Sequence, residues 1–186
     1  MTDHERFAEI SAAFRGTDVA ALRAVLGDST SFPNEPLPVD VFGPMGSVLE
    51  YAIYHSPLPM IRALVESGAD LNPPDGTHAG FPPLLATLSK LRTGGGAKAR
   101  PDALEILRLL LDAGADPNQR GLNDWTALHM AVAERSLEAV RILLDAGADP
   151  ALRTRIDDCQ SPLEDARQAN LTGIVLLLEA NEVRPS

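Results

Sequence analysis

The sequence predicts an all-α solenoid, a fold built by stacking repeated pairs of short helices. The prediction rests first on three copies of one closing segment, in which Gly68, Gly114 and Gly147 follow an apolar run and precede Ala-Asp. The last two of these glycines are 33 residues apart, and the first two are 46 apart. Self-similarity of this kind is the sequence signature of repeat architectures. The 186 residues are therefore expected to form one elongated domain.

A second motif opens each repeat and fixes its length. The openings SVLEYA, PPLLAT, TALHMA and SPLEDA begin at Ser47, Pro82, Thr126 and Ser161. Ser47 and Thr126 each precede a closing glycine by 21 residues, and the same step from Ser161 reaches Asn181. Because asparagine tolerates the left-handed backbone that often ends a helix, we predict that Asn181 closes the last repeat. From Pro82 the step is 32 residues, which indicates an insertion, visible as LRTGGGAKARP.

Each repeat is predicted to contain two helices. Thr126 is expected to cap the first helix of its repeat, which runs to about Glu134, and Gly147 is expected to end the second. In the last repeat Pro162 falls at the first helical position, where its missing N–H costs nothing. Helices of about ten residues are shorter than the roughly 12 to 15 at which an isolated helix becomes marginally stable. Stacking between repeats must therefore supply the stability.

The period of 33, an opening close to TPLHxA and a closing LLxxGADxN resemble the ankyrin repeat. The resemblance covers roughly residues 47–181, and FAEISAAFRGTDVAALRAVLGDS forms a weaker first copy, with Gly16 at its turn and its second helix ending near Leu26. It implies a single domain, residues 1–186, of about five repeats, the first and last acting as caps. Their approximate ranges are 4–27, 47–72, 82–118, 126–150 and 161–181. A Pro-rich linker at 28–46 is expected to be ordered and non-helical, and a basic, glycine-rich insert occupies 90–101.

Two positions depart from the ankyrin pattern. In the family, the Thr and His of the opening hydrogen-bond to hold the turn and the neighbouring repeat, and Thr126 and His129 keep this pair. At the histidine position the other repeats carry Glu50, Leu85 and Glu164. This loss is expected to weaken the coupling between repeats. Asp124 stands where the family prefers glycine in the hairpin, so the hairpin lead is also expected to be eroded.

The charge balance restricts the class of partner. The chain has 26 acidic and 16 basic side chains, a net charge of -10 at pH 7. Binding to DNA or RNA backbones requires a basic surface, so no nucleic-acid partner is predicted, and a basic protein partner is favoured. Apolar runs such as IVLLL at 174–178 are far shorter than the roughly 20 residues that cross a bilayer. With no secretory signal and a lone cysteine, Cys159, the expectation is a cytoplasmic, monomeric protein without membrane association.

No group of residues has the spacing of a catalytic or metal site. The histidines at His4, His55, His78 and His129 are scattered, and Cys159 has no thiol partner, so zinc-ligand spacing is absent. The segment TGGGAK at 93–98 lacks the Ser or Thr and the preceding strand of a phosphate-binding loop. We therefore predict a protein without enzymatic activity, cofactor or metal.

A surface for a protein partner remains as the predicted function. Ankyrin proteins typically bind with their hairpin tips and the exposed side of their first helices, which form a concave strip. The resemblance selects Tyr51, Tyr54, His55, Phe81, Ser89, Lys90, Asn123, Trp125, Glu134, Gln160 and Gln168, with Ala133 and Ala169 beside two of them. Tyr and Trp often dominate the binding energy of interfaces, which favours Tyr54 and Trp125. Packing against the neighbouring hairpin is the alternative interpretation of Trp125.

The insert supplies a second candidate surface. From Ser89 to Pro101 there are four basic residues and no acidic one, and Arg92, Lys98 and Arg100 are the candidate contacts. The insert either grips an acidic partner surface or is a tolerated insertion kept soluble by its charge. An inhibitory or masking role toward one partner is the most specific form of the protein-binding hypothesis. A small-ligand site or an enzyme, in a cleft between the insert and the concave face, is the alternative.

Overall fold

A computed structural model of the protein describes residues 2–27, 29–38, 46–74, 80–91, 99–121, 124–156 and 159–182. In these residues the named elements are all α-helices, and the β pairing is confined to an isolated bridge between Pro36 and Ser47. The predicted all-α fold class is confirmed. Two compact units are present, unit 1 from Met1 to Ala86 and unit 2 from Thr87 to Ser186, and the single domain over 1–186 stays a prediction.

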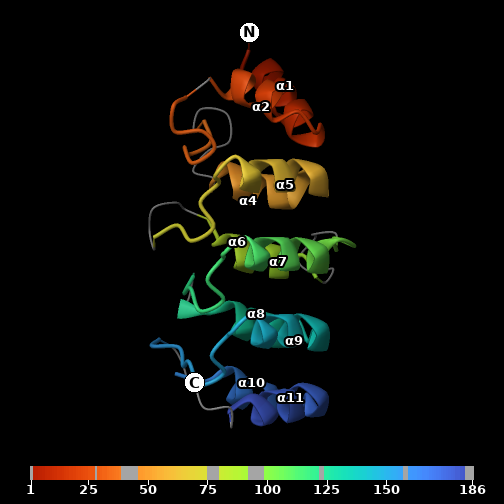
Figure 1. Ribbon diagram of the computed structural model, residues 1–186, viewed down its shortest axis with the longest axis vertical. Coiled ribbons are helices and arrows are strands. Elements are labelled where there is room, and N and C mark those ends of the chain that lie inside the picture. The colour runs from red at the N-terminus through yellow and green to blue at the C-terminus, as the bar shows by residue number, and fades with distance from the viewer. Residues whose placement is uncertain are drawn as a thin grey trace. The chain divides into compact units, whose positions relative to one another are not determined.

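Unit 1 holds two complete helix pairs, α1 (Asp3–Arg15) with α2 (Val19–Leu26) and α4 (Val48–His55) with α5 (Leu58–Glu66), and α6 (Pro83–Leu88) spans the boundary to unit 2. Each pair consists of two helices joined by a short turn (Figure 1). The first helices of the pairs contact each other, and so do the second helices. The interior of unit 1 is apolar, and Ile10, Phe14, Ile53 and Leu64 are fully buried.

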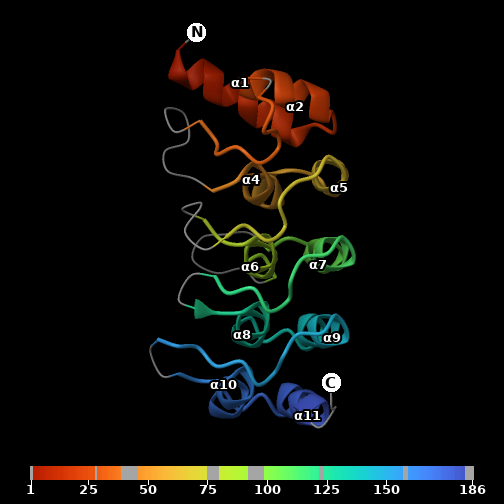
Figure 2. The same ribbon diagram turned by 60° about the vertical axis from the view of Figure 1, so that its left-hand side comes forward.

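Unit 2 repeats this arrangement with α7 (Ala103–Asp112), α8 (Ala127–Ala133), α9 (Leu137–Asp145), α10 (Pro162–Gln168) and α11 (Thr172–Glu182). Figure 2 shows α8 and α10 in one row and α7, α9 and α11 in a second, with the hairpins on the side of the first row. The contacts agree, because α8 touches α10 and α9 touches both α7 and α11. These helices are too short to be stable alone, and their neighbours in the stack stabilise them.

The predicted helix boundaries are largely confirmed. Thr126 precedes α8, Glu134 follows its last residue, and Pro162 is the first residue of α10. Gly68, Gly114 and Gly147 have φ angles of 88°, 99° and 88°, the left-handed conformation that ends a helix most cheaply at glycine.

The prediction for Asn181 was wrong. Asn181 is a helical residue of α11, which continues to Glu182. Its side-chain amide donates a hydrogen bond to the carbonyl oxygen of Leu177 at 2.8 Å, one turn earlier. The amide therefore supports a continuing helix instead of a left-handed end.

The helix ends of the first repeat and the described part of the linker agree with the sequence analysis, whereas residues 28 and 39–45 of the linker lie outside the described residues. Gly16 follows α1, and α2 ends at Leu26. Residues 29–38 form turns and bends without helix, as expected for the Pro-rich linker, and the Asn34 side chain ties them to the end of α5 by donating to Gly68 O at 3.0 Å and accepting from Asp70 N at 2.7 Å. Most of the basic insert, residues 92–98, lies outside the described residues.

Candidate functional site

Glu50 occupies the histidine position of the opening motif in unit 1 and connects two repeats. Its side chain is 5% exposed, and Oε1 accepts hydrogen bonds from the backbone N–H of Phe81 at 2.7 Å and from the Tyr54 hydroxyl at 3.4 Å. Two glycines make room for the carboxylate, since a Cβ at Gly46 or Gly80 would lie 1.4 or 1.7 Å from Oε2. The expected weakening of the coupling is therefore wrong at Glu50, because this carboxylate replaces the histidine as the link.

His129 holds the corresponding position in unit 2 and has a structural role. It is 1% exposed, and its Nδ1 lies 3.2 Å from the backbone nitrogen and 2.9 Å from the hydroxyl of Thr126. Its Nε2 lies 3.1 Å from the carbonyl oxygen of Gln160, which can only accept, so Nε2 carries the proton. Burial lowers the pKa of His129 below its usual 6.5, although the hydrogen bond to Gln160 acts in the opposite direction. The neutral imidazole thus has both nitrogens engaged within the fold.

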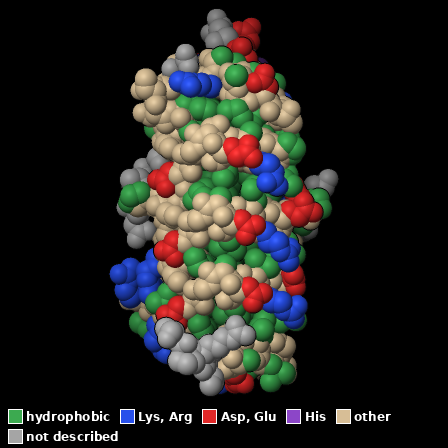
Figure 3. Space-filling model, viewed as in Figure 1, with side chains coloured by type: hydrophobic (Ala, Val, Ile, Leu, Met, Phe, Trp, Pro, Cys, Tyr) green, Lys and Arg blue, Asp and Glu red, His purple; other side chains and the backbone are tan. Residues whose placement is uncertain are grey.

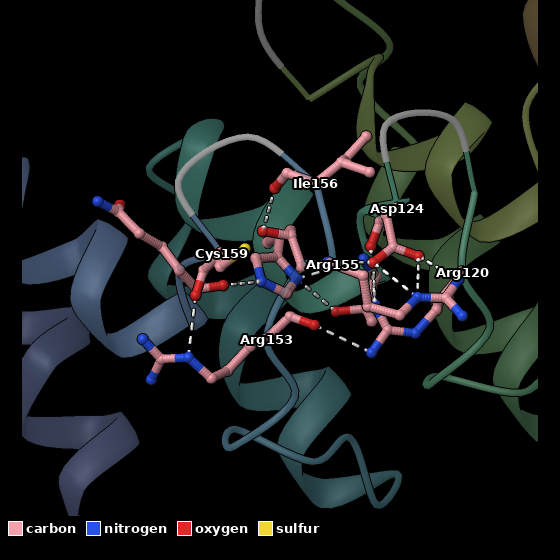
Figure 4. Close-up of polar contacts among 10 residues, drawn as sticks. Arg120, Asp124, Arg153, Arg155, Ile156 and Cys159 are labelled. Atoms are coloured by element: carbon pink, nitrogen blue, oxygen red, sulfur yellow. Dashed lines mark hydrogen bonds and ion pairs between the residues drawn. The ribbon is translucent and has the colours of Figure 1, made fainter.

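Asp124 joins two neighbouring hairpins of unit 2 (Figure 4). Its φ of 61° is left-handed, and its side chain is 7% exposed. The carboxylate accepts from Arg120 Nη1 at 2.6 Å and from both the backbone N–H and the guanidinium of Arg155. The hydrogen bond from Arg155 holds the pKa of Asp124 below its usual 3.8. The expected erosion of the hairpin is wrong, because Asp124 adopts a left-handed backbone of the kind that glycine favours and adds a link that glycine lacks.

The same hairpins present a basic edge. Arg153 and Arg155 have side chains that are 55% and 69% exposed, and Figure 3 shows basic side chains gathered on the hairpin side of unit 2, at the lower left of the view. Arg153 is fixed by donating from Nε to the carbonyl oxygen of Cys159 at 2.9 Å and by an ion pair with Glu164 at 2.7 Å. Both arginines therefore stabilise the hairpins, because each already has an acidic partner within unit 2.

A pocket opens between α8 and α10. Its volume is about 220 Å³, and its lining consists of Trp125, Val132, Ala133, Arg135, Asp165 and Ala169. Trp125 is half-buried and stands directly before Thr126, at the point where the hairpin enters the helix. Trp125, Ala133 and Ala169 come from three separate places in the sequence, and all three belong to the predicted concave strip. The structure therefore brings together part of the predicted surface in unit 2.

A larger groove of about 400 Å³ lies between the second helices α7 and α9. Its charged residues include Glu138, which pairs with Arg108 at 2.7 Å and with Arg141 at 3.4 Å. The three side chains are 44% to 54% exposed, and ion pairs of this exposure contribute little to stability or to chemistry. This groove is on the opposite row of helices from the predicted surface.

The predicted site residues of unit 1 have unequal access. Tyr51 is 7% exposed and packs against Phe14 with ring centroids 4.6 Å apart, so its side chain belongs to the interior of unit 1. Tyr54 and Phe81 are half-buried, whereas His55 is exposed and stacks on Tyr51 at 4.3 Å. Of the four residues predicted for a partner surface in unit 1, only His55 is therefore fully exposed.

In unit 2, Ser89, Lys90, Glu134 and Gln160 are half-buried, and Gln168 is exposed. Of the basic insert, Arg100 is half-buried and forms an ion pair with Asp102 at 2.7 Å, so its charge is matched within its own segment. Three other predicted contacts lie outside the described residues, namely Arg92, Lys98 and Asn123.

Sequence reasoning missed Val132, Arg135 and Asp165 as pocket residues. Val132 is an apolar residue of α8, and its residue type gives no sign that it borders a pocket. The sequence did contain a signal at Arg135. This arginine stands in the short turn between two helices, where glycine or asparagine usually provides the left-handed backbone.

Neither metal chemistry nor a membrane span has support among the described residues. No group of three or more His, Cys, Asp and Glu side chains is close enough there to hold a metal ion. The described helices also lack the combination of length and apolar character that crossing a bilayer demands.

Comparison with known proteins agrees with this architecture. Residues 97–185 match the family model described as Ankyrin repeats (3 copies), and a search of curated proteins gave no match to the chain. The matched range begins before α7 and includes α8 to α11, so it contains the pocket and the paired hairpins. Residues 97–185 therefore belong to the ankyrin-repeat family.

Proposed function

We propose that the protein is a non-enzymatic interaction module that binds a partner protein through the first-helix side of unit 2. Ankyrin repeats generally mediate protein–protein interaction. The observation that carries the proposal is the pocket between α8 and α10, because it unites Trp125, Ala133 and Ala169 in one concave site. Tryptophan is enriched among the residues that contribute most to binding energy at protein interfaces.

The size of the pocket supports a side chain of a partner as its occupant. A cavity of about 150 Å³ is large enough to hold benzene, and this pocket has about 220 Å³. Sites for small-molecule ligands usually have about 300 to 1,000 Å³. A single large apolar side chain, inserted from a partner surface, therefore matches the pocket better than a metabolite does.

Charge supports a partner with a basic surface facing unit 1. Unit 1 has 11 acidic and 4 basic residues, whereas unit 2 has 15 and 12. Such an imbalance speeds the association of oppositely charged proteins at low salt. An inhibitory or masking action on this partner, in the cytoplasm and by a monomer, completes the proposal. The small-ligand or enzyme alternative depends on the insert, of which residues 92–98 lie outside the described part of the chain.

The proposal is tested with three forms of the full chain used as bait in an extract of the source cells. The forms are wild type, Trp125→Ala and, as a matched control, Leu176→Ala, which truncates a side chain that is 63% exposed on α11 and does not line the pocket. Circular dichroism checks that each variant is folded. A protein retained by wild type and Leu176→Ala but lost by Trp125→Ala supports the proposal. Equal retention by all three forms contradicts it.

A further inference from the structure

Arg135 adopts a backbone conformation that arginine disfavours. Its φ is 55°, and it follows α8 in the turn that leads to α9. A left-handed backbone is unfavourable for a residue that has a Cβ atom. The equivalent turn between α10 and α11 has Asn170 at a φ of 57°, and asparagine visits this region more readily. Strained residues of this kind persist where the surroundings or the function require them, so the contacts of Arg135 decide between these reasons.

Backbone hydrogen bonds hold the turn, from Arg135 N to Val132 O at 2.9 Å and from Ser136 N to Ala131 O at 3.0 Å, but they do not require an arginine side chain. Within the described part of unit 2, every other arginine forms an ion pair: Arg100, Arg108, Arg120, Arg141, Arg153, Arg155 and Arg167. The exposed Arg135 guanidinium forms neither an ion pair nor a hydrogen bond with these described residues. It is nevertheless one of the residues that line the pocket beside Trp125.

The second charged residue of the pocket does not match this cation. Asp165 acts on His129, because its negative charge favours the protonated imidazole and opposes the lowering of the His129 pKa by burial, and Asp165 forms no ion pair with Arg135. The remaining lining is apolar and comes from Trp125, Val132, Ala133 and Ala169. The pocket thus combines apolar walls with one unmatched cation, and an arginine guanidinium is suited to binding a carboxylate through two parallel hydrogen bonds.

We infer that the pocket recognises a segment of the partner protein in which an apolar residue stands beside an aspartate or glutamate. The apolar side chain enters the pocket against Trp125, and the carboxylate pairs with Arg135. This inference rests on the proposed function and names the chemistry of the partner segment. The aspartate or glutamate of the partner is needed only at Arg135, in unit 2. A basic partner surface facing unit 1 is compatible with it, because unit 1 has a larger excess of acidic residues than unit 2.

The test is a selection of random peptides displayed on phage, with the immobilised full chain as target. On wild type, the enriched peptides are expected to carry Leu, Ile, Met or Phe with Asp or Glu within two residues. On Arg135→Gly, the apolar preference is expected to remain while the acidic preference disappears, and a wild-type-selected peptide should bind about tenfold more weakly or worse. Arg135→Lys keeps the charge and should recover part of this affinity.

A matched variant separates recognition from backbone strain. Both Arg135→Gly and Asn170→Gly replace a left-handed residue by glycine, so both should melt at a higher temperature than wild type. Asn170→Gly should bind the selected peptides as wild type does. A role of Arg135 in the fold alone would instead leave peptide binding unchanged in Arg135→Gly.

The outcomes distinguish this inference from the proposed function. Peptides that depend on Trp125 but keep their acidic residue on Arg135→Gly, or that carry basic residues instead, overturn the inference and leave the proposed function standing. A selection that yields no peptide sensitive to Trp125→Ala contradicts the proposed function and the inference together.

Discussion

Replacement of Asp124 is expected to destabilise unit 2, by an amount that depends on the substitute. Truncation to alanine removes the acceptor for Arg120 and for the backbone and guanidinium of Arg155. Hydrogen bonds to a charged group contribute about 1.5 to 3 kcal/mol where they are buried. The pair with Arg155 counts for less than about 1 kcal/mol because that side chain is 69% exposed, whereas Arg120 is 21% exposed. Together these contacts predict a loss of about 3 kcal/mol in the free energy of unfolding.

The backbone of Asp124 provides an internal comparison. At a φ of 61°, alanine is strained and glycine is not. The Asp124→Gly variant loses the same contacts but is relieved of the strain, so it should be about 1 kcal/mol more stable than Asp124→Ala. Both variants should remain less stable than wild type.

Urea unfolding followed by tryptophan fluorescence measures these differences directly, because the only tryptophan, Trp125, is the next residue in the chain. Asp149→Ala is the control, since this exposed carboxylate accepts within the described structure from the nearby Ala151 N–H at 2.9 Å, and it should lose less than about 1 kcal/mol. An Asp124→Ala variant as stable as Asp149→Ala would refute the role of the carboxylate. An Asp124→Gly variant less stable than Asp124→Ala would refute the argument about backbone strain.

Three further predictions concern the joints between repeats. Burial lowers the pKa of His129, so the unfolded chain binds a proton more readily than the folded chain does. Wild type should therefore lose stability as the pH falls below about 6.5. In a pH series of melting temperatures, His129→Gln should flatten this dependence. Gly80→Ala should destabilise unit 1 by about 1 to 3 kcal/mol in chemical denaturation, because the new Cβ displaces Glu50, whereas the same substitution in Glu50→Gly should cost less. Asn118→Ala should cost about 1 to 3 kcal/mol and increase hydrogen exchange at Asp149 N, since the side chain donates to Gly147 O at 3.2 Å and accepts from Asp149 N at 2.8 Å.

The repeat architecture could be predicted from the sequence because its signals are local. A closing glycine reports a left-handed helix end by itself, and Thr126 and Pro162 mark helix starts through their own capping chemistry. Asn181 shows the limit of this reasoning. The same amide that tolerates a left-handed turn also bonds to a carbonyl one turn earlier, and the structure has the second arrangement.

The candidate site was only partly predictable because it depends on partners distant in sequence. From the sequence, Glu50 is only a replacement of the usual histidine, whereas its role as a link depends on the space that Gly46 and Gly80 leave for its carboxylate. Trp125 could be proposed from its residue type and its place before Thr126, but the pocket beside it depends on how α10 packs on α8. Tyr51 was selected by residue type, whereas its contact with Phe14 from another helix pair removes it from the surface.

The histidine position has a consequence for how freely the repeats can be exchanged. Glu50 accepts from the backbone N–H of Phe81, whereas His129 donates to the backbone carbonyl of Gln160, although Phe81 and Gln160 stand at the same place before the next opening. The two joints therefore have opposite hydrogen-bond polarity. A repeat grafted from one joint onto the other would set an acceptor against an acceptor or a donor against a donor. The repeats that contain Glu50 and His129 share a common plan, but they are not interchangeable modules, because each is matched to its own successor.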